Sequence, residues 1–177
     1  MSDYEGYLIP KGLSSLSSRS DADLRSSLYG LYPIMSSPMR GISGSKLVIE
    51  MAKNNCLGIL HRFETPENRL RMIDEVAKEN IPFGIAIGFG QTMGEFRNTE
   101  FNIVKKAYEA GAIMAIVDTA NGYIPQHKER GELLRTLFPD LALGSGNVVT
   151  KEGAQYLRDC GFDYIRVGIG GGSVCQT

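Results

Sequence analysis

Short, uniformly apolar runs recur along the chain, separated by longer stretches of mixed polarity. Each run lacks the strict alternation of apolar and polar residues that marks a half-exposed strand. Runs of this kind are typical of parallel strands that are buried on both faces of a sheet. We therefore predict six strands, at Tyr32–Met35, Leu57–Leu60, Phe83–Ile87, Ile113–Val117, Leu141–Leu143 and Tyr164–Val167.

The stretches between these runs have the spacing of amphipathic helices. Residues that favour a helix N-cap precede three of them, at Thr65, at Asn98 or Thr99, and at Thr150. Glycines that favour a helix end follow two of them, at Gly111 and Gly161. We expect the two remaining gaps to be helical as well, around Ser45–Asn54 and Glu129–Leu137.

Strand and helix alternate along the sequence, which predicts βαβ units on a parallel sheet. Two folds fit this order, a doubly wound sheet and a (β/α)8 TIM barrel. Polar or glycine-rich residues follow nearly every predicted strand, and function spread over all strand ends is typical of the barrel. We therefore predict an α/β fold in which residues 31–177 form about the first six βα units of a TIM barrel, preceded by an N-terminal arm at residues 1–30.

Composition narrows the classes of function. The chain has 177 residues with 19 Lys and Arg against 20 Asp and Glu, so its net charge of −1 offers no cationic excess for nucleic acid. No apolar run reaches the ~18 residues of a membrane span, and the acidic start of the chain does not have the pattern of a signal peptide. We therefore expect a cytoplasmic protein that binds neither nucleic acid nor membrane.

The richest candidate chemistry lies in the last residues of the sequence. Arg166–Thr177 places a predicted strand before a glycine-rich loop that carries Ser173 and Cys175. Glycines let backbone N–H groups converge on an anion, and a thiol beside such a loop has a route to nucleophilic use. The alternative is a flexible tail whose cysteine has no function. We reject a Rossmann site, because Ser173 stands where the last glycine of G-x-G-x-x-G belongs.

Other strand ends carry supporting candidates. Asp118 ends the fourth predicted strand, where its carboxylate could accept hydrogen bonds from a ribose or a base, or only stabilise a turn. Asn147 follows the fifth strand and could contact a ligand through its amide, or belong to a plain turn. His61 follows the second strand, but a lone histidine is more often structural than catalytic. No spacing of cysteine and histidine indicates a zinc site.

Together these segments resemble the motifs of one known family, in order and over nearly the whole chain. The segments similar to motifs of the IMP dehydrogenase / GMP reductase family are Tyr7–Lys11, Ser36–Met39, Leu57–Phe63, Asp118–Tyr123, Gly146–Thr150 and Arg166–Thr177. Several motifs in order are far more specific than any one of them. The resemblance implies a (β/α)8 barrel with a cysteine that attacks C2 of a purine nucleotide.

The resemblance also implies roles for individual residues. Cys175 would be the nucleophile, and Thr177 would assist proton transfer on the leaving group. Substrate would contact Ser37, Met39, Gly171, Gly172 and Ser173, with the glycines and Ser173 around the 5′-phosphate. The cofactor would contact Asp118, Thr119, Ala120, Asn147, Arg166 and Gly168. A potassium ion would match the backbone carbonyls of Gly170, Gly172 and Cys175.

Two directions of reaction stay open. Reductive deamination of GMP to IMP and ammonia would use NADPH, whereas oxidation of IMP to XMP would use NAD. The interval between Phe63 and Phe83 is too short for the regulatory insertion of most dehydrogenases in this family, and Asn121–Tyr123 resembles the reductase motif. The reductase direction is therefore favoured, and a homotetramer is implied in either case.

The sequence also departs from the family pattern. Arg40 stands where the family usually has an aspartate, and the chain is expected to end just after the cysteine loop. Such a chain would lack the last strands needed to close a barrel. Two alternatives from other classes remain, a relative that binds nucleotide without turnover and a flavin-dependent barrel with a similar phosphate cradle. Yellow colour in the purified protein would identify the flavin-dependent barrel.

Overall fold

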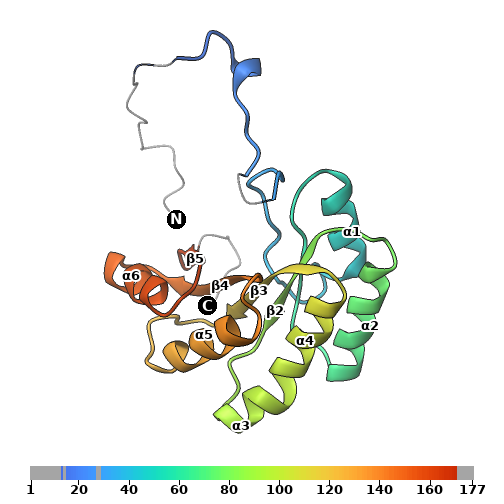
Figure 1. Ribbon diagram of the computed structural model, residues 1–177, viewed down its shortest axis with the longest axis vertical. Helices are drawn as coiled ribbons and strands as arrows, with labels where there is room; N and C mark the ends of the chain where they lie inside the picture. Colours follow the sequence, from blue (N-terminus) through green and yellow to red (C-terminus); the bar gives the residue numbers. More distant parts are fainter. Residues whose placement is uncertain (1–12, 14, 27–28, 171–177) are drawn as a thin grey trace.

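The computed structural model describes residues 13, 15–26 and 29–170. Five strands form one parallel sheet, and strands that follow one another in the chain are neighbours in the sheet (Figure 1). A doubly wound sheet would instead reverse its strand order near the middle. The strands are β1 (Ile59–Leu60), β2 (Phe83–Ile87), β3 (Ala112–Asp118), β4 (Ala142–Val148) and β5 (Tyr164–Val167). This α/β architecture is consistent with part of a TIM barrel.

Helices alternate with the strands. They are α1 (Ser45–Lys53), α2 (Pro66–Ala77), α3 (Met93–Glu95), α4 (Phe101–Glu109), α5 (Gln126–Leu137) and α6 (Lys151–Asp159). Two predicted N-caps are confirmed, because the hydroxyl groups of Thr65 and Thr150 accept backbone N–H hydrogen bonds in the first turns of α2 and α6. Gly111 and Gly161 follow helix ends with φ angles of +91° and +89°, as their positions predict.

One predicted cap is wrong. The sequence predicts a helix start at Asn98 or Thr99, but the helix begins after Thr92, whose hydroxyl accepts a hydrogen bond from the Glu95 N–H at 3.1 Å. From there α3, a π-helical turn η3 (Phe96–Glu100) and α4 run on continuously. The side chain of Phe96 is fully buried, so the apolar face of the helix extends further toward its N-terminus than the pattern indicates.

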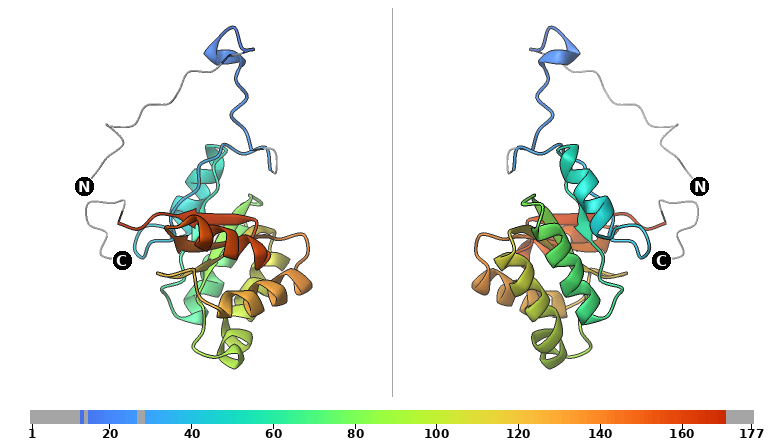
Figure 2. Two further views of the ribbon diagram at one scale, coloured as in Figure 1. Left: turned by 90° about the vertical axis from the view of Figure 1, so that its left-hand side faces the viewer. Right: turned by 90° about the vertical axis from the view of Figure 1, so that its right-hand side faces the viewer.

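The helices surround one face of the sheet, as Figures 1 and 2 show. The larger hydrophobic core lies between that face and the helices. It contains a fully buried residue from each of the five longer helices, namely Val48, Val76, Val104, Leu134 and Leu157. Burial of one apolar stripe per helix is what their amphipathic patterns predict.

The opposite face of the sheet carries a smaller core of six buried residues, Leu57, Ile59, Ala86, Met114, Ile116 and Ala142. Gly84 leaves room for the end of the Ile59 side chain, because a Cβ there would lie 2.5 Å from Cδ1 of Ile59. Tyr29 and Leu31 pack against this core, and the Tyr29 hydroxyl donates a hydrogen bond to the Ile113 carbonyl at 3.1 Å. The segment before the first helix therefore covers part of this face.

The first predicted strand is wrong in form. Residues 32–35 lie beside β1 but make one isolated bridge, between Met35 and Leu57. The Ile34 N–H donates to the Tyr32 carbonyl of its own segment at 2.7 Å instead of to β1, so no regular ladder forms. In the described residues the sheet therefore has five strands rather than six. Conversely, β4 runs to Val148, beyond its predicted end, because it pairs with β3 as far as Gly146 and with β5 as far as Val148. The fully buried Ser145 fits within it, since its hydroxyl donates to the Val117 carbonyl at 3.3 Å.

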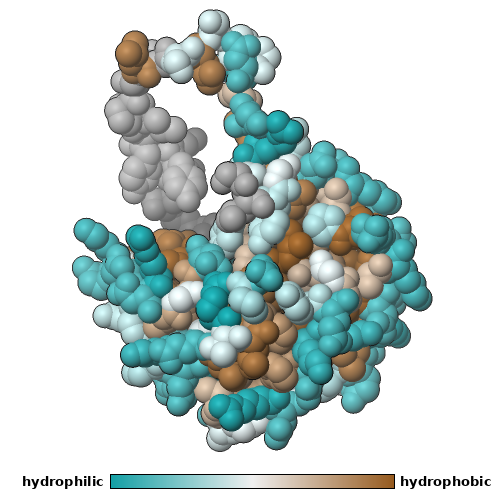
Figure 3. Space-filling model, in the orientation of Figure 1, coloured by the Kyte–Doolittle hydropathy of each residue, from teal (hydrophilic) through white to brown (hydrophobic). Residues whose placement is uncertain are grey.

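Residues 13 and 15–26 project away from the sheet. A 3-10 turn, η2 (Arg19–Asp21), is fixed by a capping box, in which the Ser18 N–H donates to the Asp21 carboxylate at 2.9 Å. Leu13 and Leu24 are exposed, and apolar residues of this segment are visible in brown at the top of Figure 3. In the described part of the chain, no helix is long and apolar enough to cross a membrane.

Candidate functional site

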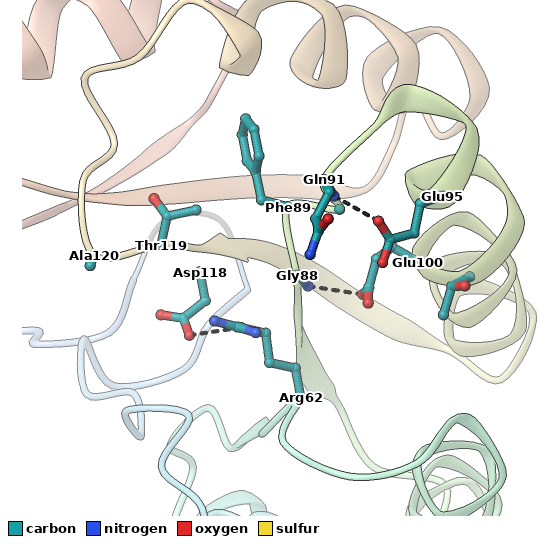
Figure 4. Close-up of a pocket in the computed structure, with 11 residues that line it drawn as sticks. Arg62, Gly88, Phe89, Gln91, Glu95, Glu100, Asp118, Thr119 and Ala120 are labelled. Carbon is teal, nitrogen blue, oxygen red and sulfur yellow. Dashed lines mark hydrogen bonds and ion pairs between the residues drawn. The ribbon is translucent and has the colours of Figure 1, made fainter.

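The candidate site lies at the carboxyl edge of the sheet, by which we mean the last residue of each strand and the loop that follows it. A cavity of about 450 Å³ opens there, between the ends of β1, β2 and β3 and the start of the α3–η3–α4 helix (Figure 4). Its lining residues are Arg62, Gly88, Phe89, Gly90, Gln91, Glu95, Thr99, Glu100, Asp118, Thr119 and Ala120.

Asp118, the last residue of β3, lies between two arginines. Its Oδ2 accepts a hydrogen bond from Nε of Arg62 at 3.2 Å, and its Oδ1 accepts one from Nη1 of Arg166 at 2.5 Å. The Asp118 side chain is 14% exposed, and the Arg62 guanidinium also lies 4.4 Å from the ring centre of Phe63. These charge-assisted contacts fix the orientation of the carboxylate at the cavity wall.

Hydrogen bonds beyond the regular ladder tie together the ends of β3, β4 and β5. The Asn147 N–H donates to the Thr119 carbonyl at 2.8 Å, and its side-chain Nδ2 donates to the Gly168 carbonyl at 2.7 Å. Gly146 has a φ of +148°, and a Cβ there would lie 2.6 Å from the Arg166 carbonyl oxygen. Only glycine permits this close approach, which brings Arg166 to Asp118.

The loop between β2 and α3, residues 88–91, forms the opposite wall of the cavity. The Gly88 N–H donates to Oε2 of Glu100 at 2.9 Å, and the Gln91 N–H donates to Oε2 of Glu95 at 2.8 Å (Figure 4). Gly90 has a φ of +67°, and a Cβ there would lie 2.9 Å from the backbone nitrogen of Phe96. The loop is therefore packed directly against the helix that follows it.

Glu100 also forms a buried ion pair behind this wall. Nη1 and Nη2 of Arg69 contact the two oxygens of Glu100 at 2.9 and 2.8 Å, and the side chains are 5% and 13% exposed. Nη2 of Arg69 donates further to the Ala86 carbonyl at 3.2 Å. A bidentate pair of this kind fixes the Glu100 carboxylate, which in turn fixes the Gly88 N–H.

His61 has a structural role, as we expect for a lone histidine. It is 5% exposed, does not line the cavity, and its Nδ1 accepts a hydrogen bond from the Phe63 N–H at 3.2 Å. Burial is the main cause that lowers the pKa of His61 below its ordinary value. The side chain therefore carries no charge at neutral pH.

The structure brings the predicted cofactor residues together. Three of them, Asp118, Thr119 and Ala120, line the cavity itself. The other three, Asn147, Arg166 and Gly168, lie next to them and are linked by the hydrogen bonds just described. The predicted set thus occupies neighbouring strand ends at one edge of the sheet.

Only some of the residues predicted to bind substrate and potassium lie in the described part of the chain. Ser37 and Met39 are exposed on the loop after residues 32–35, outside this cavity, where the Met39 N–H donates to the Ser37 carbonyl at 2.8 Å. Gly170 is described and has a φ of +73°. The remaining predicted site residues lie outside the described part of the chain, namely Gly171, Gly172, Ser173, Cys175 and Thr177.

Sequence reasoning missed Gln91 of the β2–α3 loop and the helical wall of the cavity, which consists of Glu95, Thr99 and Glu100. Arg62 and Gly88 could have been found, because each follows a predicted strand closely. Glu100 carries a weaker signal. It lies four residues after the buried Phe96 and three before the buried Ile103, so helical spacing places it on the inward face.

The fold and this edge define a class of protein. It is an α/β protein with parallel strands in chain order, which gathers paired charges and a cavity at the carboxyl ends of its strands. The family model for the "IMP dehydrogenase / GMP reductase domain" matches residues 4–177. The chain therefore belongs to the IMP dehydrogenase / GMP reductase family.

Individual relatives agree with this membership. The chain is 29% identical to a GMP reductase of Bacillus subtilis (strain 168) and 27% identical to one of Oenococcus oeni, in each case over 99% of this chain and 53% of the relative. It is 38% identical to an inosine-5′-monophosphate dehydrogenase of Streptococcus pyogenes over 52% of this chain and 18% of that relative. The chain thus spans about half the length of the reductases it matches.

Proposed function

We propose that the protein containing this chain is a purine nucleotide oxidoreductase that converts GMP to IMP and ammonia with NADPH. The observation that carries the proposal is the carboxylate of Asp118, fixed between Arg62 and Arg166 beside a cavity at the carboxyl edge. Similarity to GMP reductases along 99% of the chain supports the reductive direction. The activity is proposed for the whole protein, because the chain covers 53% of those relatives.

The cavity has a size and a donor set that fit part of a nicotinamide dinucleotide. Its volume of about 450 Å³ lies in the range of small-molecule sites. A carboxylate has about four lone-pair directions, so Asp118 can accept from ribose hydroxyl groups while both arginines stay bound. Thr119 and Ala120 would contact the cofactor from the same strand end, and Asn147, Arg166 and Gly168 from its neighbours. NADPH supplies a hydride when bound.

The covalent step is proposed for Cys175 on the strength of the family resemblance. Its thiolate would attack purine C2, and the 2-amino group would leave as ammonia, with Thr177 assisting the proton transfer. C2 would then accept the hydride and the C–S bond would break, which releases the thiolate and gives IMP. One C–N bond is replaced by one C–H bond, and the nicotinamide is oxidised. Formation of a covalent intermediate divides one difficult step into two easier ones.

Contacts to the nucleotide and an ion complete the proposed site. Ser37 and Met39 would contact the nucleotide, and Gly171, Gly172 and Ser173 would hold its 5′-phosphate. Backbone carbonyls suit potassium, and those of Gly170, Gly172 and Cys175 would bind it. We further propose that residues 31–177 form the first six βα units of a (β/α)8 barrel, with residues 1–30 as an arm, in a cytoplasmic homotetramer.

The proposal is tested by turnover of the purified protein. GMP and NADPH are mixed with it and the nicotinamide absorbance is followed, with IMP and NAD as the parallel assay. Cys175→Ala is expected to abolish turnover and to leave GMP binding within about tenfold of the unsubstituted protein. Turnover that survives this substitution would contradict the covalent mechanism.

A second candidate function is oxidation of IMP to XMP with NAD. The 38% identity to the Streptococcus pyogenes dehydrogenase over 93 residues favours it. Turnover of IMP with NAD in the absence of GMP turnover would establish this direction. GMP binding with turnover in neither assay would instead identify a nucleotide-binding relative without catalysis.

A further inference from the structure

Helix α5 buries an arginine that has no acidic partner among the described residues. Arg130 is 2% exposed, and within the described residues no carboxylate forms an ion pair with its guanidinium. Burial of a cation is costly unless its donors find acceptors. The acceptors that Arg130 contacts therefore indicate its structural role.

The guanidinium of Arg130 binds the β2–α3 loop. Its Nε donates to the Phe89 carbonyl at 2.7 Å and its Nη2 donates to the Gly90 carbonyl at 3.4 Å, while Nη1 donates to the Gln126 carbonyl of its own helix at 3.1 Å. The guanidinium carbon also lies 3.9 Å from the ring centre of Phe89. One side chain thus contacts two successive carbonyls and one ring of the loop.

His127, one turn earlier on α5, completes this contact. Its ring centre lies 4.8 Å from that of Phe89, and the side chain is fully buried. Burial, with a smaller contribution from the charge of Arg130, lowers the pKa of His127 to about 4. The imidazole is therefore neutral at neutral pH and adds no charge beside the guanidinium.

The same loop forms a wall of the cavity through Gly88, Phe89, Gly90 and Gln91. Its N–H groups at Gly88 and Gln91 are held by Glu100 and Glu95, and its carbonyls at Phe89 and Gly90 are held by Arg130. The loop is therefore held from two sides, with its N–H groups bound by the α3–η3–α4 helix and its carbonyls bound by α5. Of these contacts, those of Arg130 come from a helix that contributes no residue to the cavity.

We propose that Arg130 is a positioning residue, which sets the affinity for the dinucleotide by holding the β2–α3 loop in place. This inference rests on the proposed function, because it takes the cavity to be the cofactor site. Arg130 lines no part of the cavity itself and acts through Phe89 and Gly90. It therefore affects binding of the dinucleotide more than the chemical step at purine C2.

The same helix offers a matched control. Arg135 also donates to backbone carbonyls, those of Pro139, Leu141 and Gly161, but at the opposite end of the strands. Arg135→Lys and Arg130→Lys remove the same planar fork of donors and keep the positive charge. Both variants are expected to lose some stability of the whole fold, whereas only Arg130→Lys is expected to change the cavity.

The experiment compares Arg130→Lys, Arg130→Met and Arg135→Lys in the full protein. Both Arg130 variants are expected to raise the KM for NADPH about tenfold, the loss expected when hydrogen bonds from a charged group are removed, and to keep kcat within about twofold. Arg135→Lys is expected to leave both constants unchanged. Arg130→Met also removes the buried charge, which helps that variant to fold.

Hydrogen exchange of the Gly88 and Gln91 amides gives a second readout that needs no turnover. Exchange is expected to be about tenfold faster in Arg130→Lys and unchanged in Arg135→Lys, because loss of the carbonyl contacts frees the loop. Equal effects of the two variants on KM, or unchanged exchange at Gly88 and Gln91 in Arg130→Lys, would overturn the proposal. If the unsubstituted protein turns over neither GMP nor IMP, the proposed function has failed, and exchange alone decides the role of Arg130.

Discussion

The two edges of the sheet use arginines of one helix in different ways. At the amino edge, where the strands begin, Arg135 contacts the Asp163 carboxylate at 2.6 Å and three carbonyls of the loops before β4 and β5. At the carboxyl edge, Arg130 holds a loop whose other side faces a cavity. Arg135 thus holds loops together within the fold, whereas Arg130 supports a loop that a ligand in the cavity can contact.

Size does not separate the two edges, because a hollow of about 590 Å³ also opens at the amino edge. It is lined by Arg135, Arg158 and Asp163 among others. The Asp163 carboxylate there is occupied by Arg135 and by the Leu143 N–H, both contacts to the fold itself. In barrels, residues at the amino edge serve stability and those at the carboxyl edge serve catalysis. The chemistry of the lining residues therefore decides which hollow is the site.

The largest expected effect comes from the buried ion pair at the carboxyl edge. Glu100→Gln leaves Arg69 buried without its countercharge and should lower the free energy of unfolding by about 3 kcal/mol. Asp163→Asn breaks a pair whose side chains are 34% and 43% exposed, and should cost about 1 kcal/mol or less. Urea denaturation of both variants measures the difference. Equal losses would mean that burial does not distinguish the two edges.

The second effect concerns pH. The pKa of His127 is about 4 in the folded protein against 6.5 for the free group, so below pH 6.5 the unfolded chain binds a proton that the folded chain does not. The free energy of unfolding should therefore fall by about 3 kcal/mol as the pH decreases from 6.5 to 4, and this loss should reverse when the pH is raised again. Denaturant unfolding across this range measures the loss.

His127→Phe is the matched variant for this pH dependence. Both ring nitrogens of His127 are buried without a hydrogen-bond partner in the described residues, so phenylalanine removes two unsatisfied polar atoms. It should abolish most of the loss between pH 6.5 and 4, and leave the smaller contribution of His61, whose pKa is also lowered by burial. An unchanged pH dependence in this variant would show that His127 titrates normally.

The third effect is on activity. Asp118→Asn leaves Arg62 and Arg166 without their shared carboxylate and should lower kcat/KM for GMP and NADPH about a hundredfold, or about 2.7 kcal/mol. Asp163→Asn removes the charge of a carboxylate at the other edge and should leave kcat/KM unchanged. Steady-state assays of both variants are decisive, because an equal decrease would mean that the carboxyl edge is not the active one.

The same comparison explains which features of the fold and the site could be predicted from the sequence. The caps at Thr65 and Thr150 and the position of Asp118 at a strand end are local features, and the structure confirms them. Glu100 was missed because its partner, Arg69, is 31 residues away, and no local pattern reports such a pairing. The strand expected at residues 32–35 is not formed because the Ile34 N–H bonds to the Tyr32 carbonyl, a local turn that the apolar pattern does not report.

The smallest expected effect tests the start of the helix at the carboxyl edge. Thr92→Ala removes the hydroxyl that accepts the Glu95 N–H and should lower the free energy of unfolding by about 1 kcal/mol. Asn98, one of the two caps that the sequence predicts, lies inside η3, so Asn98→Ala should change stability by less than about 0.5 kcal/mol.

Thr150→Ala, at the start of α6, gives the reference value for a cap that sequence and structure agree on. If Asn98→Ala costs as much as Thr150→Ala, the helix begins at Asn98 and Glu95 does not lie on a helix beside the cavity. If Thr92→Ala alone matches the reference, the continuous α3–η3–α4 helix is what fixes Glu95 and Glu100 beside the cavity. An error of six residues in a helix start, nearly two turns, therefore decides whether Glu95 belongs to the helical part of the site.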